Sequence, residues 1–360
     1  MLCLFENRFL SATALAVLAI MIATGLAAAS SFSQKDGETE VPDGFLNKKV
    51  YSYDEKGRKQ ELRVFGEAAN LLERKIYHYN GDHRPAEIVI EDGYGRYRGR
   101  QELKYDRRGR KISQLIYDRY GFIQEGNEYR YDDEGNRTLW RHLTFEGKPD
   151  WSRRYAYDKR GNRTEERWKD ETGRITHHYV YSYNPRGHLS GQSVYDHEGE
   201  LQWRYGYDYD LNGQRVAIRW YDERDRLRWI RTYAYDAKGQ RIEERRYMAF
   251  RRIFTGRTGY RLKHLFSYEY DDMGNMTYQR VYDARGNEFW SIEKSYDNAG
   301  RLVSYVNYDH RGEVEYRYEL SYNEMGLKTE WRWYDDQGNL AWMHLYVYDD
   351  AGRMVKEVEY

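Results

Sequence analysis

The sequence predicts an all-β protein: a long antiparallel meander of about twenty or more strands that forms a curled or spiralled sheet. A short phrase, Tyr-Asp-x-x-Gly, recurs at regular spacing along most of the 360-residue chain. Between its copies, apolar and charged side chains alternate with the period of two that is typical of a strand. A fixed period of this kind indicates a repeat architecture.

The copies of the phrase follow one another at alternating shorter and longer steps, as from Tyr183 to Tyr195 and from there to Tyr209. The repeating unit therefore contains the phrase twice and extends over both steps, as from Tyr183 to Tyr209. Such steps leave about eight to ten residues between turns, which suits a strand but is too short for a crossover helix. Successive strands are expected to be antiparallel neighbours.

The phrase itself has the residues of a tight turn. Asp or Asn after the Tyr can accept hydrogen bonds from backbone amides further along the turn, and the Gly accepts positive φ. A type I turn followed by a left-handed Gly is a common hairpin connection with a β-bulge. We therefore expect a hairpin turn at each copy, with Gly239 as one of the left-handed residues.

The longer strands carry an aromatic column on one face. The position six residues before the Tyr of the phrase holds Trp151, His177, Trp203, Trp229, His264, Trp290, Tyr316 and Trp342. Because this offset is even, the column shares one face with the Tyr of the phrase. The opposite face carries charged pairs such as Glu243 and Arg245. This alternation predicts a sheet that is wet on one side.

Two interpretations of the column remain open. Exposed rings about 10 Å apart, two strand widths, can stack on sugar rings. In the interpretation that we favour, the rings form the hydrophobic face of a curled sheet, because an open sheet of so many strands curls or splits. The candidate ligand-binding residues are the tryptophans of the column: Trp151, Trp203, Trp229, Trp290 and Trp342.

Three segments are expected along the chain. Residues 1–29 hold a long apolar run that ends in small residues, as in a secretory signal peptide. The run is also long enough for an uncleaved membrane anchor that contacts the bilayer. Residues 30–48 have the composition of a flexible linker, and residues 49–360 form the repeat array. We expect an exported protein, in the periplasm, on the cell surface or secreted, and membrane-anchored if the segment is uncleaved.

The rhythm of the repeats breaks once, near residues 248–263. The step from Tyr247 to Tyr270 exceeds the longer step, such as that from Tyr195 to Tyr209, by nine inserted residues. Because the inserted segment is basic, we expect it to form a solvated loop. Contact with an acidic partner or a membrane surface is the alternative. The candidate partner-contact residues are Arg251, Arg252, Arg257 and Arg261.

Composition and motifs argue against several classes of function. The 59 basic residues balance 59 acidic ones, which does not favour nucleic acid as a partner. The ten histidines show no metal-binding spacing, and no P-loop or nucleophile elbow stands between a strand and a helix. The single cysteine, Cys3, precedes the apolar run, so a cleaved chain would contain no thiol. We expect no metal, no cofactor and no enzymatic activity.

The phrase, followed by Arg or Asn, resembles the YD repeats of the bacterial RHS family and of the teneurin shell. Tyr105 to Arg110 and Tyr131 to Asn136 are typical matches, and the resemblance covers about residues 50–360. It implies strands joined into a long curving sheet, which in large family members winds into a hollow shell around a toxin. The Asp-Pro-x-Gly core motif of the family is missing from this sequence, which argues against toxin carriage.

These observations together predict a non-enzymatic repeat protein that binds or scaffolds at the cell envelope or outside the cell. Its expected partner is a carbohydrate or a cell-envelope protein. Two alternatives remain open: a glycan-active enzyme with two carboxylates facing each other across an aromatic groove, and a toxin-associated shell protein of the RHS type.

Overall fold

The computed structural model describes residues 46–251 and 258–360. Within these residues the chain forms 24 β-strands and one short 3₁₀ turn, η1 (Phe145–Gly147). This confirms the predicted all-β antiparallel meander. The apolar segment and most of the expected linker lie outside the described residues, so their assignment stays a prediction. No helix in the described part of the chain has the length and apolarity needed to cross a membrane.

Long and short strands alternate along most of the chain. The odd-numbered strands are β1 (Asn47–Tyr53), β3 (Leu71–Tyr79), β5 (Tyr97–Tyr105), β7 (Ile123–Tyr131), β9 (Pro149–Tyr157), β11 (Ile175–Tyr183), β13 (Leu201–Tyr209), β15 (Leu227–Tyr235), β17 (Thr258–Tyr270), β19 (Glu288–Tyr296), β21 (Val314–Tyr322) and β23 (Leu340–Tyr348). The even-numbered strands are β2 (Lys59–Gly66), β4 (Pro85–Asp92), β6 (Lys111–Asp118), β8 (Arg137–Leu143), β10 (Arg163–Lys169), β12 (Leu189–Tyr195), β14 (Arg215–Tyr221), β16 (Arg241–Arg251), β18 (Met276–Asp283), β20 (Leu302–Tyr308), β22 (Lys328–Tyr334) and β24 (Met354–Glu359).

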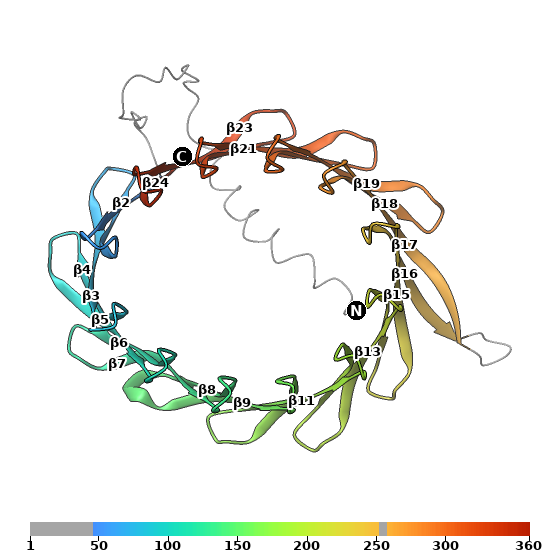
Figure 1. Ribbon diagram of the computed structural model, residues 1–360, viewed down its shortest axis with the longest axis horizontal. Coiled ribbons are helices and arrows are strands. Elements are labelled where there is room, and N and C mark those ends of the chain that lie inside the picture. Colours follow the sequence, from blue (N-terminus) through green and yellow to red (C-terminus); the bar gives the residue numbers. More distant parts are fainter. Residues whose placement is uncertain (1–45, 252–257) are drawn as a thin grey trace. The chain divides into compact units, whose positions relative to one another are not determined.

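All strands belong to one sheet, in which each strand pairs antiparallel with the next. The sheet also closes on itself, because β1 pairs with β24 from Asn47 opposite Glu359 to Val50 opposite Lys356. Figure 1 shows the resulting ring of strands. A curled or spiralled sheet was expected from the sequence; the sheet is closed instead, which leaves neither β1 nor β24 as an unpaired edge.

Hairpin turns lie at two edges of the closed sheet. We call the edge with the turns after odd-numbered strands, from Asp54–Arg58 to Asp349–Arg353, the bonded edge. The edge with the turns after even-numbered strands is the open edge. In Figure 1 the turns of the bonded edge gather toward the centre of the ring, whereas the hairpins of the open edge, such as β16–β17, flare outward.

The sheet is a single layer. Close contacts between elements join neighbouring strands, apart from the contact of η1 with β7. Few side chains are fully buried, and Val194, Val281 and Val358 are the largest of these. The apolar contacts therefore run sideways within one face of the sheet and not between two stacked layers.

The inserted segment lengthens one hairpin instead of forming a separate loop. Strand β16 continues to Arg251 and β17 starts at Thr258, and these two residues pair. Much of the stretch expected as an irregular insertion near 248–263 is therefore strand, and only residues 252–257 lie outside the described part. Antiparallel pairing explains this, because extra residues on both sides of a turn can extend the ladder.

Candidate functional site: the aromatic face and its two edges

Each copy of the phrase forms the expected turn. At Asp106 the amide of Gly109 donates to the Asp106 carbonyl oxygen at 2.9 Å. The Asp106 carboxylate accepts the amides of Arg108 and Arg110, each at 2.9 Å. These hydrogen bonds, first that of the Arg110 amide, hold the pKa of Asp106 below its ordinary value. Gly109 has φ of +78°, a conformation that costs Gly less than any other residue.

The residue after the Gly closes the turn from the other side. Nε of Arg110 donates to Oδ2 of Asp106 at 2.7 Å, and Nδ2 of Asn136 donates to Oδ2 of Asp132 at 3.1 Å. Arg and Asn can both place a donor on this oxygen. This explains why either residue follows the Gly, a role that was not predicted from the sequence.

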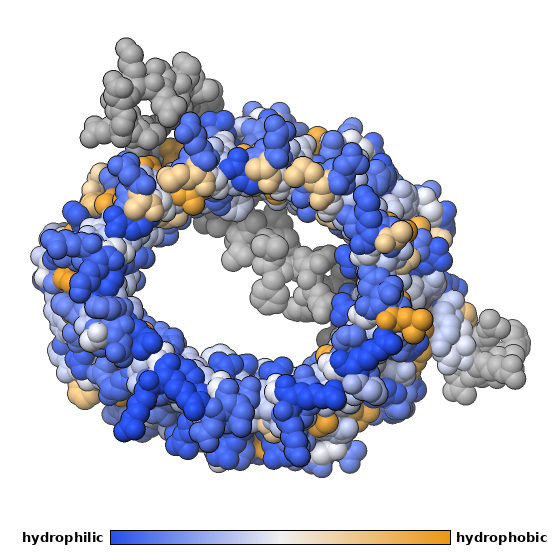
Figure 2. Space-filling model, in the orientation of Figure 1, coloured by the Kyte–Doolittle hydropathy of each residue, from blue (hydrophilic) through white to orange (hydrophobic). Residues whose placement is uncertain are grey.

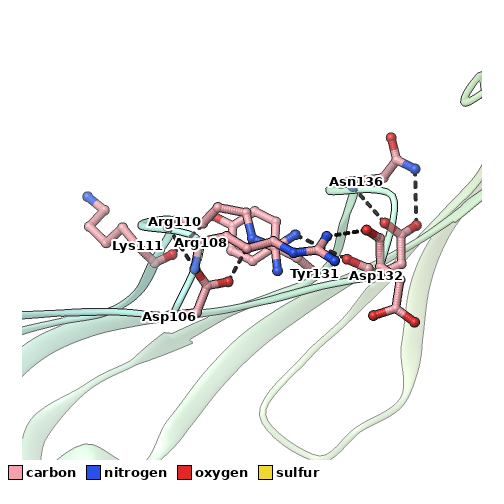
Figure 3. A network of polar contacts seen from close by, with 8 residues as sticks. Asp106, Arg108, Arg110, Lys111, Tyr131, Asp132 and Asn136 are labelled. Carbon is pink, nitrogen blue, oxygen red and sulfur yellow. Dashed lines mark hydrogen bonds and ion pairs between the residues drawn. The ribbon is translucent and has the colours of Figure 1, made fainter.

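On the bonded edge the Tyr of the phrase joins neighbouring hairpins (Figure 3). The Tyr131 hydroxyl donates to the carbonyl oxygen of Lys111 at 3.0 Å, and the Arg110 guanidinium lies 4.7 Å from the Tyr131 ring centre. The same hydroxyl-to-carbonyl bond is made by every Tyr of the phrase at this edge: Tyr53, Tyr79, Tyr105, Tyr131, Tyr157, Tyr183, Tyr209, Tyr235, Tyr270, Tyr296, Tyr322 and Tyr348.

The closure of the sheet uses the same contact. The Tyr53 hydroxyl donates to the carbonyl oxygen of Met354 at 2.8 Å, and the Arg353 guanidinium lies 4.9 Å from the Tyr53 ring centre. An ion pair between Lys49 and Glu357, at 3.0 Å, adds to the seam. The junction of β1 and β24 therefore repeats the geometry of the other bonded-edge contacts.

On the open edge the Tyr of the phrase points to the opposite, charged face. The Tyr308 hydroxyl donates to Glu293 at 2.9 Å, and the Tyr334 hydroxyl donates to Glu319 at 3.1 Å. The turn glycines of this edge include Gly199 and Gly312, and a β-carbon on either would meet no atom within 4 Å. At these two turns no neighbouring group packs against the glycine.

The face that carries the bonded-edge tyrosines and the predicted column is the aromatic face. Its rings contact one another within and across strands: the Tyr205 ring centre lies 5.1 Å from that of Trp203 on the same strand and 5.7 Å from that of Trp229 on β15. Trp331 and Trp342 lie 4.6 Å apart in the same way. The five predicted tryptophans, all on this face, are half-buried: Trp151, Trp203, Trp229, Trp290 and Trp342. Tyr205 was not singled out from the sequence, although its even offset from Tyr209 places it on this face.

Two hollows lie on the aromatic face near the open edge, and each contains a predicted tryptophan. The first, of about 420 Å³, lies beside Trp290 and is lined also by Tyr305, Asn307, Glu315 and Tyr316. The structure thus places Trp290 beside polar groups that spacing alone did not connect with it.

The second hollow, of about 360 Å³, lies beside Trp151 and is lined also by Asp150, Arg153, Trp168 and Asp170. Here the chain supplies its own cation. The Arg153 guanidinium lies 3.8 Å from the ring centre of Trp168 and 4.9 Å from that of Trp151. Nε of Arg153 is buried without a hydrogen-bond partner, so the rings are its main neighbours.

A β-bulge supplies a side chain next to the column at the open edge. The register shifts at the end of β8 against β9 and at the end of β20 against β21, so one extra residue faces each shift. The extra residues Asp150 and Glu315 reach the aromatic face, where Asp150 contacts His142 at 3.1 Å and Glu315 accepts from Asn307 at 2.6 Å. Bulges commonly redirect a side chain in this way.

The predicted arginine cluster is only partly described. Arg252 and Arg257 lie outside the described residues, and Arg251 is placed only as the last residue of β16. Arg261, on β17, is exposed, and its guanidinium lies 5.8 Å from the Phe250 ring centre. The described residues do not bring the four arginines together into one site.

No group of three or more His, Cys, Asp or Glu side chains among the described residues is arranged to hold a metal ion. The histidines on the aromatic face contact rings instead. His142 stacks on Trp151 with ring centres 5.3 Å apart, and burial holds the pKa of His264 below its ordinary value.

A family model described as "Uncharacterised protein" matches residues 47–172. No curated protein matches the sequence. The crystal structure of TcdB2-TccC3-Cdc42 is similar, with a TM-score of 0.35 and 15% identity over 85% of this chain and 20% of that chain. A porin-like protein from Bacteroides uniformis gives a TM-score of 0.26 and 9% identity over 88% and 95% of the two chains. The N-terminal domain of effector protein SpvB from Salmonella typhimurium gives 0.21 and 9%, over 67% and 87%.

The chain therefore spans about a fifth of the length of the TcdB2-TccC3 chain that it matches. The family model covers the first part of the repeat array only, from Asn47. Membership of the YD-repeat family stays a prediction that depends on the phrase itself.

Proposed function

We propose that this chain is an exported, non-enzymatic protein that binds and scaffolds at the cell envelope or outside the cell, with carbohydrate as its ligand. The observation that carries the proposal is the aromatic face, a band of half-buried rings on a sheet whose strands make close contacts only with their neighbours. Extended apolar surface on a soluble protein is typical of an interaction site. The apolar run in residues 1–29 supports export.

The bonded edge supports a scaffolding role. Its hydroxyl-to-carbonyl bonds, such as that from Tyr183 to Arg163 at 2.8 Å, fix each hairpin against the one before it. The spacing of the rings on the aromatic face is then set before a ligand arrives. Such preorganisation lowers the entropy that binding would otherwise cost.

The hollows beside Trp151 and Trp290 are the positions where we expect a sugar to sit. Each combines an aromatic ring with polar side chains, Asp150 and Asp170 in one and Asn307 and Asp309 in the other. Apolar walls with a few placed polar groups are the usual composition of small-molecule sites.

A glycan array probed with residues 30–360 tests the proposal. We expect binding to a restricted set of glycans that is lost in Trp151→Ala or Trp290→Ala. Tyr94→Ala, at a tip of the open edge where the side chain is 86% exposed, is the matched control and should bind as the wild type does. Absence of binding to any glycan on the array would refute the proposal. Release of cleaved sugar would favour the glycan-active alternative.

A second candidate function is a shell that encloses a partner polypeptide, as the YD-repeat resemblance implies. The observation that favours it is the closure of the sheet, and Figure 2 shows an open space enclosed by the described residues. Co-expression with the product of a neighbouring gene tests it. Protection of that product from protease in the presence of this chain would support a shell, and unchanged digestion would exclude that partner.

A further inference from the structure

We propose that the hollow beside Trp290 binds an organic cation of the trimethylammonium type, the group found in choline. This inference does not depend on the carbohydrate proposal, because it follows from the charge and the ring surfaces of one hollow. It concerns Trp290, Tyr305 and Tyr316, with Glu315 as the charged partner.

Three rings from three neighbouring strands wall the hollow. Trp290 comes from β19, Tyr305 from β20 and Tyr316 from β21. The Tyr305 and Tyr316 rings are stacked on each other, with centres 5.9 Å apart and planes inclined by 13°, and Tyr305 also stacks on Tyr318. Trp290 has no stacked partner among the described rings and meets Phe266 in a T-shaped contact. Because a ring face carries negative quadrupole charge, the Trp290 ring attracts cations, and quaternary ammonium groups above all.

Glu315 supplies the negative charge. The β-bulge at the start of β21 brings its carboxylate to Asn307, whose Nδ2 donates to Oε2 at 2.6 Å. Glu315 forms no ion pair with any residue that the structure describes. Asp309 also lines the hollow, but its carboxylate accepts the amides of its own turn and pairs with Arg311 at 3.1 Å. Glu315 is therefore the carboxylate that remains for a ligand.

The hollow beside Trp151 shows that this face already holds a cation between rings. There Arg153 places its guanidinium over Trp140, Trp151 and Trp168, at 3.8–4.9 Å from the ring centres. Arg153 stands four residues before Tyr157. The residue four before Tyr296 is Ile292, which lines the Trp290 hollow and carries no charge.

In one hollow the rings thus already hold a cation of the chain, and in the other they do not. No Lys or Arg of residues 46–251 and 258–360 lies over the Trp290 ring. The ammonium nearest to these rings is that of Lys294, 5.8 Å from the Tyr305 ring centre and near the outer limit of a cation–π contact. A trimethylammonium group suits the remaining space, because it has no N–H that needs an acceptor and is held by ring faces.

The test compares choline with 3,3-dimethylbutan-1-ol, its neutral carbon isostere, in calorimetric titrations of residues 30–360. We expect saturable binding of choline and about tenfold weaker binding of the isostere. Ile292→Arg should place a guanidinium in the hollow, as Arg153 does, and reduce choline affinity by about tenfold or more. Glu315→Gln should reduce it by at least about threefold. Glu198→Gln, in an exposed turn of another unit, is the control and should leave affinity unchanged.

Equal affinity for choline and its isostere would overturn the proposal, as would choline binding that neither variant changes. If Ile292→Arg does not fold, Glu315→Gln decides, because the side chain is exposed and a glutamine oxygen can still accept the hydrogen bond from Asn307. Co-sedimentation with phosphatidylcholine vesicles separates two sources of the cation. Sedimentation that Glu315→Gln abolishes assigns a lipid headgroup, and binding of free choline alone assigns a soluble ligand. Retained binding of a neutral glycan by Glu315→Gln separates this site from the carbohydrate proposal.

Discussion

The two edges of the sheet use the same five-residue phrase for different purposes. At the bonded edge the Tyr131 hydroxyl reaches the carbonyl of Lys111 on the preceding hairpin. At the open edge the Tyr308 hydroxyl reaches a carboxylate, that of Glu293, on the charged face. The turn geometry is the same at both edges, so the difference lies in the face to which the Tyr points.

The β-bulge at each turn causes this difference: the steps between copies are even, and the extra residue in each hairpin moves the next Tyr to the opposite face. Tyr183 ends a nine-residue strand on the aromatic face, whereas Tyr195 ends a seven-residue strand and follows Val194, which pairs with Tyr179 of that face. Adjacent residues of a strand point to opposite faces. One edge therefore joins the hairpins to one another, and at the other the Tyr bonds to side chains of the charged face, as Tyr308 and Tyr334 do.

The largest expected effect concerns the face that spans the two edges. Trp203→Ala should destabilise the protein by about 3 kcal/mol, at the lower end for a large aromatic residue because the ring is half-buried. The Trp203 ring centre lies 5.1 Å from that of Tyr205 on the same strand and 6.3 Å from that of Tyr179 on β11, so the change removes a contact within β13 and one with β11. Chemical denaturation measures it, with Tyr94→Ala as the exposed control. A Trp203→Ala/Trp229→Ala protein that unfolds like the wild type but loses a ligand would instead make the column a binding site.

A smaller effect separates the turns of the two edges. Gly239→Val should cost about 2 kcal/mol, because φ of +82° strains a β-branched residue. A β-carbon there would also lie 3.0 Å from Nε2 of Gln214, which donates to the Gly239 carbonyl. Gly199→Val at the open edge introduces the backbone strain without a clash, so it should lower the free energy of unfolding by less than Gly239→Val does. Thermal unfolding of both variants at the wild-type temperature would contradict the turn assignment.

Removing one hydroxyl tests the bonded edge directly. Tyr183→Phe leaves the Arg163 carbonyl without its 2.8 Å donor and should cost about 1 kcal/mol. Tyr195→Phe at the open edge removes a hydroxyl that bonds to no described carbonyl of the ladder and should change the free energy of unfolding by less than about 0.5 kcal/mol. Urea denaturation of the pair measures the difference. Equal values for both variants would show that the bonded edge is not held by its hydroxyls.

The smallest effect is a dependence of stability on acid pH. The Arg58 side chain and turn amides hold the pKa of Asp54 below its ordinary value, and the amide and guanidinium of Arg110 do the same for Asp106. Burial acts to raise the pKa of Asp92, but the hydrogen bonds of Arg96 and Tyr94 outweigh it and lower the pKa to about 2. Because the folded pKa values lie below the unfolded ones, the unfolded chain binds more protons as the pH falls.

This contribution to stability is therefore present above pH of about 4 and is lost as the pH falls toward about 2. Thermal unfolding measured across that window should show a steady decrease of the midpoint. Asp106→Asn should lower the midpoint at neutral pH and reduce its dependence on acid. A midpoint that stays constant from pH 5 to about 2 would show that the turn carboxylates do not contribute.

The strands, their antiparallel order and the aromatic face followed from the sequence, because spacing and alternation are local properties. The phrase at Tyr183 fixed the end of β11, and even offsets placed Trp203 on the correct face. The bond from Tyr131 to Lys111 was missed, since its partner lies on the preceding hairpin and not on a neighbouring position of the chain. A signal for it exists: Tyr stands at every bonded-edge copy, whereas Phe65, Glu91 and Lys169 replace it at the open edge.

Closure of the sheet could not be predicted. It depends on small twists summed over 24 strands, and no single residue encodes that sum. The hollow beside Trp290 was missed for a related reason. Its carboxylate, Glu315, belongs by strand alternation to the charged face, and only the bulge brings it to Asn307. Sequence alternation describes regular strands and fails where an extra residue enters the ladder.

The junction of β1 and β24 repeats the contact that all the other units make. This repetition has a consequence for the size of the ring. Tyr53 bonds to Met354 as Tyr131 bonds to Lys111. A unit therefore makes the same contact with a neighbour that precedes it in the chain and with one from the opposite end of the chain. A gene that gained or lost one whole repeating unit would keep each local contact and change only the circumference. The diameter of the ring, and with it the curvature offered to a ligand, is then a quantity that duplication can adjust in whole steps.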